Sequence, residues 1–342
     1  MPPAASTLDM TGCVTAVWLT VLGGAIGSFL NVVVYRLPRG LSLIEPPSHC
    51  PMCKKPIRWF DNVPVFGWIV LRGRCRDCRT PISMRYPLIE ALTAAMFGLL
   101  AASEYLSGGA NLPLRAIELV EGVTVTGLNN LQLYTIYGYH LVLLCTLLCA
   151  VLIEYDGNRL PWGLFVPAGI VGLATPLLWP HLHPVSAWTG LHGLAAGGVD
   201  GPIGLAAGTI LGLAAWRYSR HSRCSLREQT LVRGANHDVE QTPVRGANHD
   251  IEQNAGSRSE PRRSLIGRQT GLIWTAACVG LFLGWQAALV LIATTVLIQL
   301  PFAIVGRRRP GVLRIPPTAW LTLATLAWLL AWGSLVSWAE AL

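Results

Sequence analysis

Apolar stretches near the length of a membrane-spanning helix, about 20 residues, recur along the chain and alternate with polar segments. This pattern predicts an all-α polytopic membrane protein with about eight transmembrane helices. The predicted spans cover residues 12–35, 86–102, 131–153, 160–179, 201–216, 270–283, 285–305 and 318–338. Residues 1–10 hold no Lys or Arg, so they lack the basic start of a secretory signal peptide, and we expect the first apolar stretch to stay as a span.

Composition agrees with this pattern. Of the 342 residues, 52% are hydrophobic and only 13% are charged, with a mean hydropathy of +0.46. Soluble domains usually carry about 25% charged residues, so a secreted or cytosolic globule is a poor alternative. The net charge of +8 does not indicate a nucleic-acid partner, because the basic residues gather in the polar segments between apolar ones.

The distribution of charge predicts the orientation. Residues 36–85 contain ten Lys and Arg against three acidic residues, whereas residues 103–130 contain one Arg and three Glu. Lys and Arg are enriched in cytoplasmic loops, so we expect the first of these segments inside and both chain termini outside. The predicted parts are a first helix (12–35), a cytoplasmic domain (36–85), helices two to five (86–216), a cytoplasmic insertion (217–268) and the last three helices (269–342).

The insertion contains an internal repeat. The sequence VRGANHDVEQ at residues 232–241 recurs as VRGANHDIEQ at residues 244–253. Each copy has little apolar content, which favours a duplicated, disordered segment. The alternative is a divalent-metal site, for which the candidate ligands are His237, Asp238, His249 and Asp250.

The domain at 36–85 carries a metal-binding pattern. Two CxxC motifs, Cys50–Cys53 and Cys75–Cys78, are separated by 21 residues. Four thiolates from two such turns close a tetrahedron around Zn²⁺ and leave no open position, which predicts a structural rather than a catalytic metal in a zinc-ribbon-like module. Reducing conditions in the cytoplasm keep the thiols free for a metal, and redox chemistry at either CxxC is the alternative. Of the other five cysteines, four lie in apolar spans, where packing is the simplest role.

Around these cysteines, several motifs in order resemble the bifunctional type IV prepilin leader peptidases and N-methyltransferases. The resemblance is specific over residues 27–93, and weaker similarity extends through Leu160-Pro161, Gly284-Trp285-Gln286 and Ile315-Pro316. The motifs are GSFLNVVVYRLP (27–38), SHCPMC (48–53), DNVP (61–64), RCRDC (74–78) and RYPLIEALT (85–93). The resemblance implies an intramembrane aspartic endopeptidase of the inner (plasma) membrane that cleaves prepilin or pseudopilin precursors and then methylates the new N-terminus with S-adenosylmethionine.

The resemblance also implies two aspartates that activate one water molecule, and this chain departs from it at both positions. Glu154 occupies the first position, with Asp156 two residues later, and Leu272 occupies the second. Paired carboxylates act as acid and base on a shared water, whereas a leucine side chain has no proton to give or take. Glu154 and Asp156 are therefore the candidate catalytic residues.

Three functions follow as alternatives. The first is an active prepilin-processing enzyme. The second is a proteolytically inactive relative that binds precursors or pilus and secretion assembly partners, or that retains only methyl transfer. The third is a transporter or channel, for which His140 is the main ionisable residue inside a span; a lone histidine there is more often packed and hydrogen-bonded.

Overall fold

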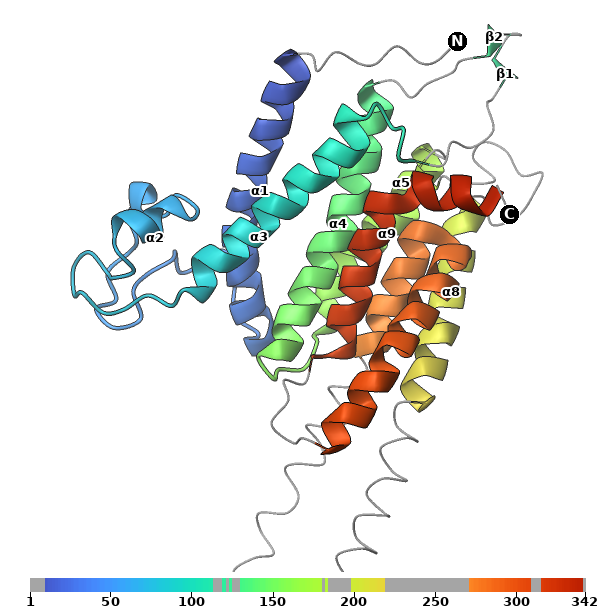
Figure 1. The fold of residues 1–342 in the computed structure, drawn as a ribbon. Helices are drawn as coiled ribbons and strands as arrows, with labels where there is room; N and C mark the ends of the chain where they lie inside the picture. The colour runs from blue at the N-terminus through green and yellow to red at the C-terminus, as the bar shows by residue number, and fades with distance from the viewer. Residues whose placement is uncertain are drawn as a thin grey trace, which may run out of the picture.

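The computed structural model describes residues 10–112, 119–120, 123–124, 130–179, 182–183, 198–218, 271–308 and 315–340. Its described part is a bundle of long helices with a small irregular module beside α1 and α3 (Figure 1). The module consists of residues 37–84, which connect these two helices. The predicted insertion at 217–268, including the repeat and its four candidate metal ligands, lies outside the described residues apart from Arg217 and Tyr218.

The long elements agree with the apolar stretches of the sequence. Six of them are long and apolar enough to cross a bilayer, and α5 with the short turn before it adds a shorter apolar segment. They are α1 (Met10–Arg36), α3 (Arg85–Leu100), α4 (Asn130–Tyr155), α5 (Phe165–Leu178), the helix Gly198–Tyr218, α8 (Gly271–Arg308) and α9 (Pro317–Glu340). This confirms the all-α membrane architecture predicted from hydropathy.

The short elements connect or extend the long ones. A π-helical segment, η3 (Ala101–Leu106), continues α3 and extends four residues beyond the predicted end of the second span. The others are η1 (Leu37–Arg39), η2 (Trp59–Asp61), α2 (Phe66–Val70), η4 (Trp162–Leu164), and the antiparallel strands β1 (Leu119–Val120) and β2 (Val123–Thr124).

Gly284 divides α8 into the two segments that hydropathy predicts at 270–283 and 285–305. Its φ of 85° and ψ of 173° are not helical, and glycine adopts a positive φ without the steric cost that a Cβ would add. Figure 1 shows the two orange arms of α8 meeting at one end of the bundle and ending at the other. With α8 counted as two arms, the described part contains all eight predicted apolar segments.

Small residues allow close approach between helices. A Cβ at Gly27 of α1 would lie 2.9 Å from the Cα of Glu90 in α3, and one at Gly23 would lie 2.7 Å from the Phe97 side chain. Between the helix Gly198–Tyr218 and α8, a Cβ at Gly204 would overlap the backbone carbonyl of Gly280. Packing of this kind is a main source of helix association in a bilayer, where lipid tails are as apolar as the side chains.

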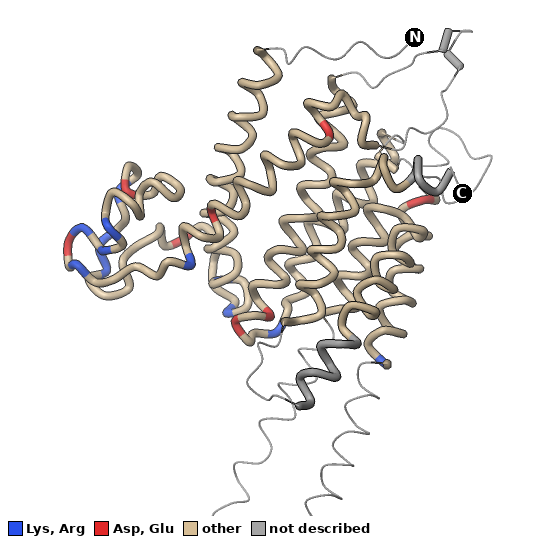
Figure 2. Tube along the Cα trace, in the orientation of Figure 1, with Lys and Arg blue, Asp and Glu red and all other residues tan. Residues whose placement is uncertain are grey.

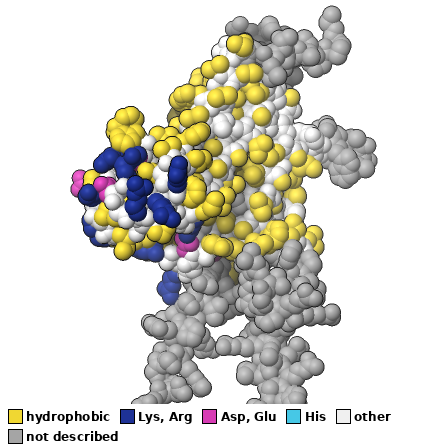
Figure 3. Space-filling view, turned by 60° about the vertical axis from the view of Figure 1, so that its left-hand side comes forward, with side chains coloured by type: hydrophobic (Ala, Val, Ile, Leu, Met, Phe, Trp, Pro, Cys, Tyr) yellow, Lys and Arg dark blue, Asp and Glu magenta, His cyan; other side chains and the backbone are white. Residues whose placement is uncertain are grey.

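Within the described residues, charge gathers on the module and near the ends of the helices, and Glu104 is buried inside the bundle. Figure 2 shows blue and red positions concentrated on the module beside α1 and α3, with a largely tan bundle next to it. In the space-filling view, Lys and Arg gather on the module while hydrophobic side chains cover the described surface of the bundle (Figure 3). This division of polar and apolar surface is typical of a protein that faces lipid along its helices.

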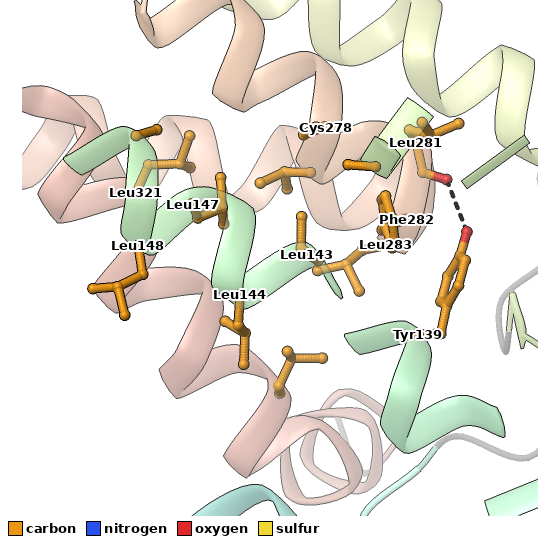
Figure 4. Packing of buried hydrophobic residues seen from close by; sticks show 14 of the residues in the cluster. Tyr139, Leu143, Leu144, Leu147, Leu148, Cys278, Leu281, Phe282, Leu283 and Leu321 are labelled. Atoms are coloured by element: carbon orange, nitrogen blue, oxygen red, sulfur yellow. Dashed lines mark hydrogen bonds between the residues drawn. The ribbon is translucent and has the colours of Figure 1, made fainter. Parts of the chain in front are cut away.

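The centre of the bundle is a leucine-rich core formed by α4, α8 and α9. Leu143, Leu144 and Leu147 of α4 are fully buried, and Phe282 of α8 is buried beside them (Figure 4). Tyr139 Oη lies 3.5 Å from the carbonyl oxygen of Leu281, as the dashed line shows. The core thus fixes the position of α4, whose last turn carries Glu154 and which is followed directly by Asp156.

Candidate functional site

Two turns with the same hydrogen-bond pattern carry the four cysteines. In the first turn the Lys54 N–H donates to the Cys50 carbonyl over 2.9 Å, and in the second the Arg79 N–H donates to the Cys75 carbonyl over 3.0 Å. Lys54 and Arg79 both adopt positive φ, at 61° and 60°. Isolated β-bridges, His49 to Pro56 and Arg74 to Pro81, close the two turns.

These turns bring the four sulfur atoms together. The Sγ atoms of Cys50, Cys53, Cys75 and Cys78 all lie within 4.8 Å of one another, and those of Cys50 and Cys78 are 3.7 Å apart. Tetrahedral Zn²⁺ with Zn–S bonds of about 2.3 Å separates its sulfur ligands by about 3.8 Å. The residues present therefore fit a single tetrahedral metal ion with four thiolate ligands.

The electrostatics of the cluster also suit a cation. Backbone hydrogen bonds from Cys53 and Met52 lower the pKa of the Cys50 thiol to about 6. At Cys53 a backbone hydrogen bond from Lys55 acts in the same direction, but lost hydration and the neighbouring thiols outweigh it and raise the pKa to about 11. One thiol of the cluster thus loses its proton readily, whereas a second thiolate would be repelled by the first. A divalent cation between the sulfur atoms relieves that repulsion.

Two ion pairs hold the rest of the module. The Arg76 guanidinium donates to both carboxylate oxygens of Asp61, over 2.8 and 2.5 Å, and lowers the pKa of this carboxyl group. Lys55 Nζ lies 3.0 Å from Asp77 Oδ1. Asp61 thus has a structural partner within the module.

The candidate Glu154 lies at the end of α4, between the first turns of two other helices. Its carboxylate accepts a hydrogen bond from the Thr318 hydroxyl at the start of α9. Its other oxygen lies against Gly271, the first residue of α8, where a Cβ would overlap it. Glu154 therefore lies beside the N-terminal turn of α9, where a helix carries partial positive charge.

Asp156, the second candidate, has a different partner. Its carboxylate accepts two hydrogen bonds from the Arg85 guanidinium, over 2.5 and 2.8 Å. Arg85 is the first residue of α3, so the pair joins the module's exit to the turn after α4. The structure therefore assigns Glu154 and Asp156 to different neighbours, and their catalytic roles stay predictions.

Leu272 occupies the position where the resemblance places the second aspartate. It is buried, and it directly follows the residue that contacts Glu154. Two residues further on, Trp274 stacks on Phe165 of α5 with ring centroids 5.8 Å apart. The three described residues that follow Gly271 in α8, residues 272–274, are thus apolar.

Sequence reasoning missed two partners at the candidate site: Arg85 for Asp156, and the Thr318 hydroxyl for Glu154. The hydroxyl bonds to a residue 164 positions away, and only the packing of α9 against α4 brings them together. The available signal is weak: a threonine directly after the Ile315-Pro316-Pro317 run, where a helix is expected to begin.

Comparisons with known proteins agree with the motifs. Residues 21–103 match the family described as the bacterial peptidase A24 N-terminal domain. The chain is 50% identical over 86 residues to a prepilin leader peptidase/N-methyltransferase of Myxococcus xanthus, covering 25% of this chain and 26% of that protein. It is 38% identical over 162 residues to one of Klebsiella pneumoniae, covering 46% and 59%.

A third relative, the prepilin leader peptidase/N-methyltransferase of Neisseria gonorrhoeae, is 43% identical over 105 residues, covering 24% of this chain and 37% of that protein. The chain thus spans between about a quarter and three fifths of the length of these relatives. No solved structure gives a significant match. The matched family and these relatives confirm the resemblance found in the motifs: over the residues matched, the chain is similar to the prepilin leader peptidase/N-methyltransferases.

Proposed function

We propose that this protein processes prepilin-like precursors at the membrane, by removing a leader peptide. The observation that carries the proposal is the match of residues 21–103 to the peptidase A24 N-terminal domain, together with relatives that are 38–50% identical and are named for this activity. Prepilin or pseudopilin precursors are the proposed partners, and the lipid bilayer of the inner membrane is the proposed location, with the module on the cytoplasmic side.

Within this function, Glu154 is the proposed catalytic carboxylate. It lies at one end of the bundle, bonded to the Thr318 hydroxyl at the start of α9, and a carboxylate there can take a proton from an attacking water. Asp156, held by Arg85, is two residues away and is the proposed positioning residue for the α3–α4 junction. Leu272 cannot supply the acid of a carboxylate pair, so we expect slow cleavage.

The module has a structural part in this proposal. Zn²⁺ is the proposed metal, because four thiolates at tetrahedral spacing suit it and leave no position for a reacting water. Methyl transfer from S-adenosylmethionine is proposed on the printed name of the relatives alone. No described residue is assigned to hold that donor.

The second candidate function is precursor binding without cleavage, with or without methyl transfer. Leu272 favours it, since the position next to the Glu154 contact carries an apolar side chain. The module and its junction with α1 and α3 are the same under both candidates, so precursor binding does not distinguish them.

Cleavage of a prepilin-like precursor by the purified full-length protein in lipid nanodiscs tests the proposal. We expect a slow release of the leader that Glu154→Gln abolishes and Glu45→Gln, an exposed acid in the module, leaves unchanged. Mass spectrometry of the mature product reads methylation separately. A precursor that binds but stays uncut under conditions where a Myxococcus xanthus-type relative cuts it supports the second candidate and contradicts the first.

A further inference from the structure

The short helix α2 and the turn η2 before it expose large apolar side chains. Trp59 is 82% exposed, Phe66 68% and Val70 72%, and Phe60 and Ile69 are exposed as well. Water-facing surfaces rarely keep this many large apolar side chains within twelve residues, so something apolar is expected to cover them.

The level of this segment along the bundle identifies what covers it. A Cβ at Gly24 of α1 would lie 3.3 Å from the Cβ of Pro64, and the Val65 N–H donates to Glu90 Oε2 over 2.7 Å. Gly24 is near the middle of α1, twelve residues and therefore about 18 Å of helix before Arg36. Because α1 is long and apolar enough to cross the bilayer, Pro64 lies beside a part of this helix that is expected within the membrane, and Phe66 follows two residues later.

The side chains around this segment suit a lipid surface. Between Asp61 and Asp77 the chain has no acidic residue, whereas Arg72, Arg74 and Arg76 follow α2 directly. Arg72 and Arg74 are exposed, and no acidic partner is recorded for either within the described residues. Figure 3 shows this combination on the module, with Lys and Arg beside hydrophobic side chains. Tryptophan and arginine together are typical of the zone between lipid headgroups and acyl chains.

We propose that α2 and Trp59 insert into the bilayer leaflet on the module's side, with acyl chains against Phe66 and Val70 and lipid phosphates against Arg72 and Arg74. The module is then a monotopic element bound to the membrane surface as well as to α1 and α3. Pro64 and Val65 hold the apolar segment at this depth, because they contact α1 and α3 directly.

A partner protein is the other occupant that such a surface would fit. Lipid is favoured because Pro64, two residues before α2, lies against Gly24 of α1, a helix long and apolar enough to cross the bilayer.

Photocrosslinking with the full-length protein tests this assignment. The photoreactive residue benzoylphenylalanine is placed at Phe66, or at Val70 in a second protein, in nanodiscs of phosphatidylethanolamine and phosphatidylglycerol. A third protein carries it at Val21, a 67% exposed position of α1 that calibrates contact with acyl chains. After irradiation, mass spectrometry identifies peptides that have gained a lipid.

We expect lipid adducts at Phe66 and Val70 with yields comparable to that at Val21, and a clear drop in yield when the protein is irradiated in a short-chain detergent without lipid. Two results overturn the proposal: probes at both Phe66 and Val70 that give no lipid adduct while the Val21 probe does, and adducts of these probes with another polypeptide instead of lipid. The use of two positions covers the case in which one substitution disturbs the module. Precursor processing does not enter either readout, so failure of this proposal is separate from failure of the proposed function.

Discussion

Glu104 Oε1 lies 2.7 Å from Nδ1 of His140, and neither side chain is exposed to solvent. Glu104 sits in the π-helical segment that continues α3, and His140 sits in α4, so the pair connects two helices inside the bundle. The other polar atoms of the pair, Glu104 Oε2 and His140 Nε2, make no hydrogen bond within the described part of the chain. The hydrogen bond between Glu104 and His140 is therefore the contact that offsets the cost of burying these two polar side chains.

We predict that Glu104→Ala lowers the free energy of unfolding by about 3–5 kcal/mol, because it leaves a buried imidazole without its acceptor. The double replacement Glu104→Met with His140→Leu is expected to be close to neutral, since neither polar group then needs a partner. Thermal unfolding of the purified protein in one detergent measures both, with Glu45→Ala on the exposed module loop as control. If the double variant is as unstable as the single one, the pair is not the source of the loss.

Metal content gives a second prediction. Cys78→Ser is expected to lower the bound metal well below one ion per chain and to speed hydrogen exchange over residues 48–82, because the module is too small to fold on apolar packing alone. Elemental analysis and exchange mass spectrometry measure the two effects. Cys13→Ser, a cysteine of α1 far from the cluster in sequence, is expected to change neither. Full metal content in Cys78→Ser would contradict the assignment of the four ligands.

The pair between Arg85 and Asp156 leads to a test by charge exchange. Asp156→Arg is expected to slow precursor processing by separating the start of α3 from the turn after α4, while the unfolding free energy changes by about 1 kcal/mol or less, because both groups are partly exposed. Arg85→Asp combined with Asp156→Arg restores the pair and is expected to recover most of the activity. Continued inactivity of the exchanged protein would instead indicate that the Asp156 carboxylate acts on the substrate.

Close packing between the helix Gly198–Tyr218 and α8 predicts a difference between two glycines. Gly208→Ala is expected to destabilise the protein by about 1–3 kcal/mol, because the new Cβ overlaps the backbone carbonyl of Ala276. Gly169→Ala in α5 meets no atom within 4 Å and is expected to be neutral or slightly stabilising. Thermal unfolding of both variants checks the contrast, and equal effects would mean that the helices separate easily there.

Hydropathy and spacing predicted much of this fold. The eight apolar segments, the break at Gly284 and the four-cysteine cluster all follow from local patterns that survive in the structure. Contacts between segments far apart in the sequence cannot be predicted from local hydropathy or residue spacing. The predicted second span ends at residue 102, yet a π-helix extends α3 and buries Glu104 against His140.

The candidate catalytic site shows the same division. Sequence motifs identified Glu154 and the loss of an acid at Leu272, since both are read from position in the chain. They did not identify Thr318 as the partner of Glu154 or Arg85 as the partner of Asp156. These partners depend on how α9 and α3 meet the end of α4, which is a property of packing.

Restoring a carboxylate at Leu272 is the sharpest test of how this site works. Leu272 directly follows the residue in contact with Glu154, so Leu272→Asp places a second carboxyl group at the same end of α8. If Glu154 works alone in a slow peptidase, the added acid is expected to raise the cleavage rate by about 10²–10⁴-fold, the usual contribution of a positioned acid or base. Leu272→Asn has the same shape as Leu272→Asp without a titratable proton and should leave the cleavage rate unchanged.

A cleavage rate that rises with Asp and not with Asn means that the rest of the site is intact and that one side chain limits it. No rise in a folded Leu272→Asp protein would instead place the loss elsewhere and support precursor binding without cleavage.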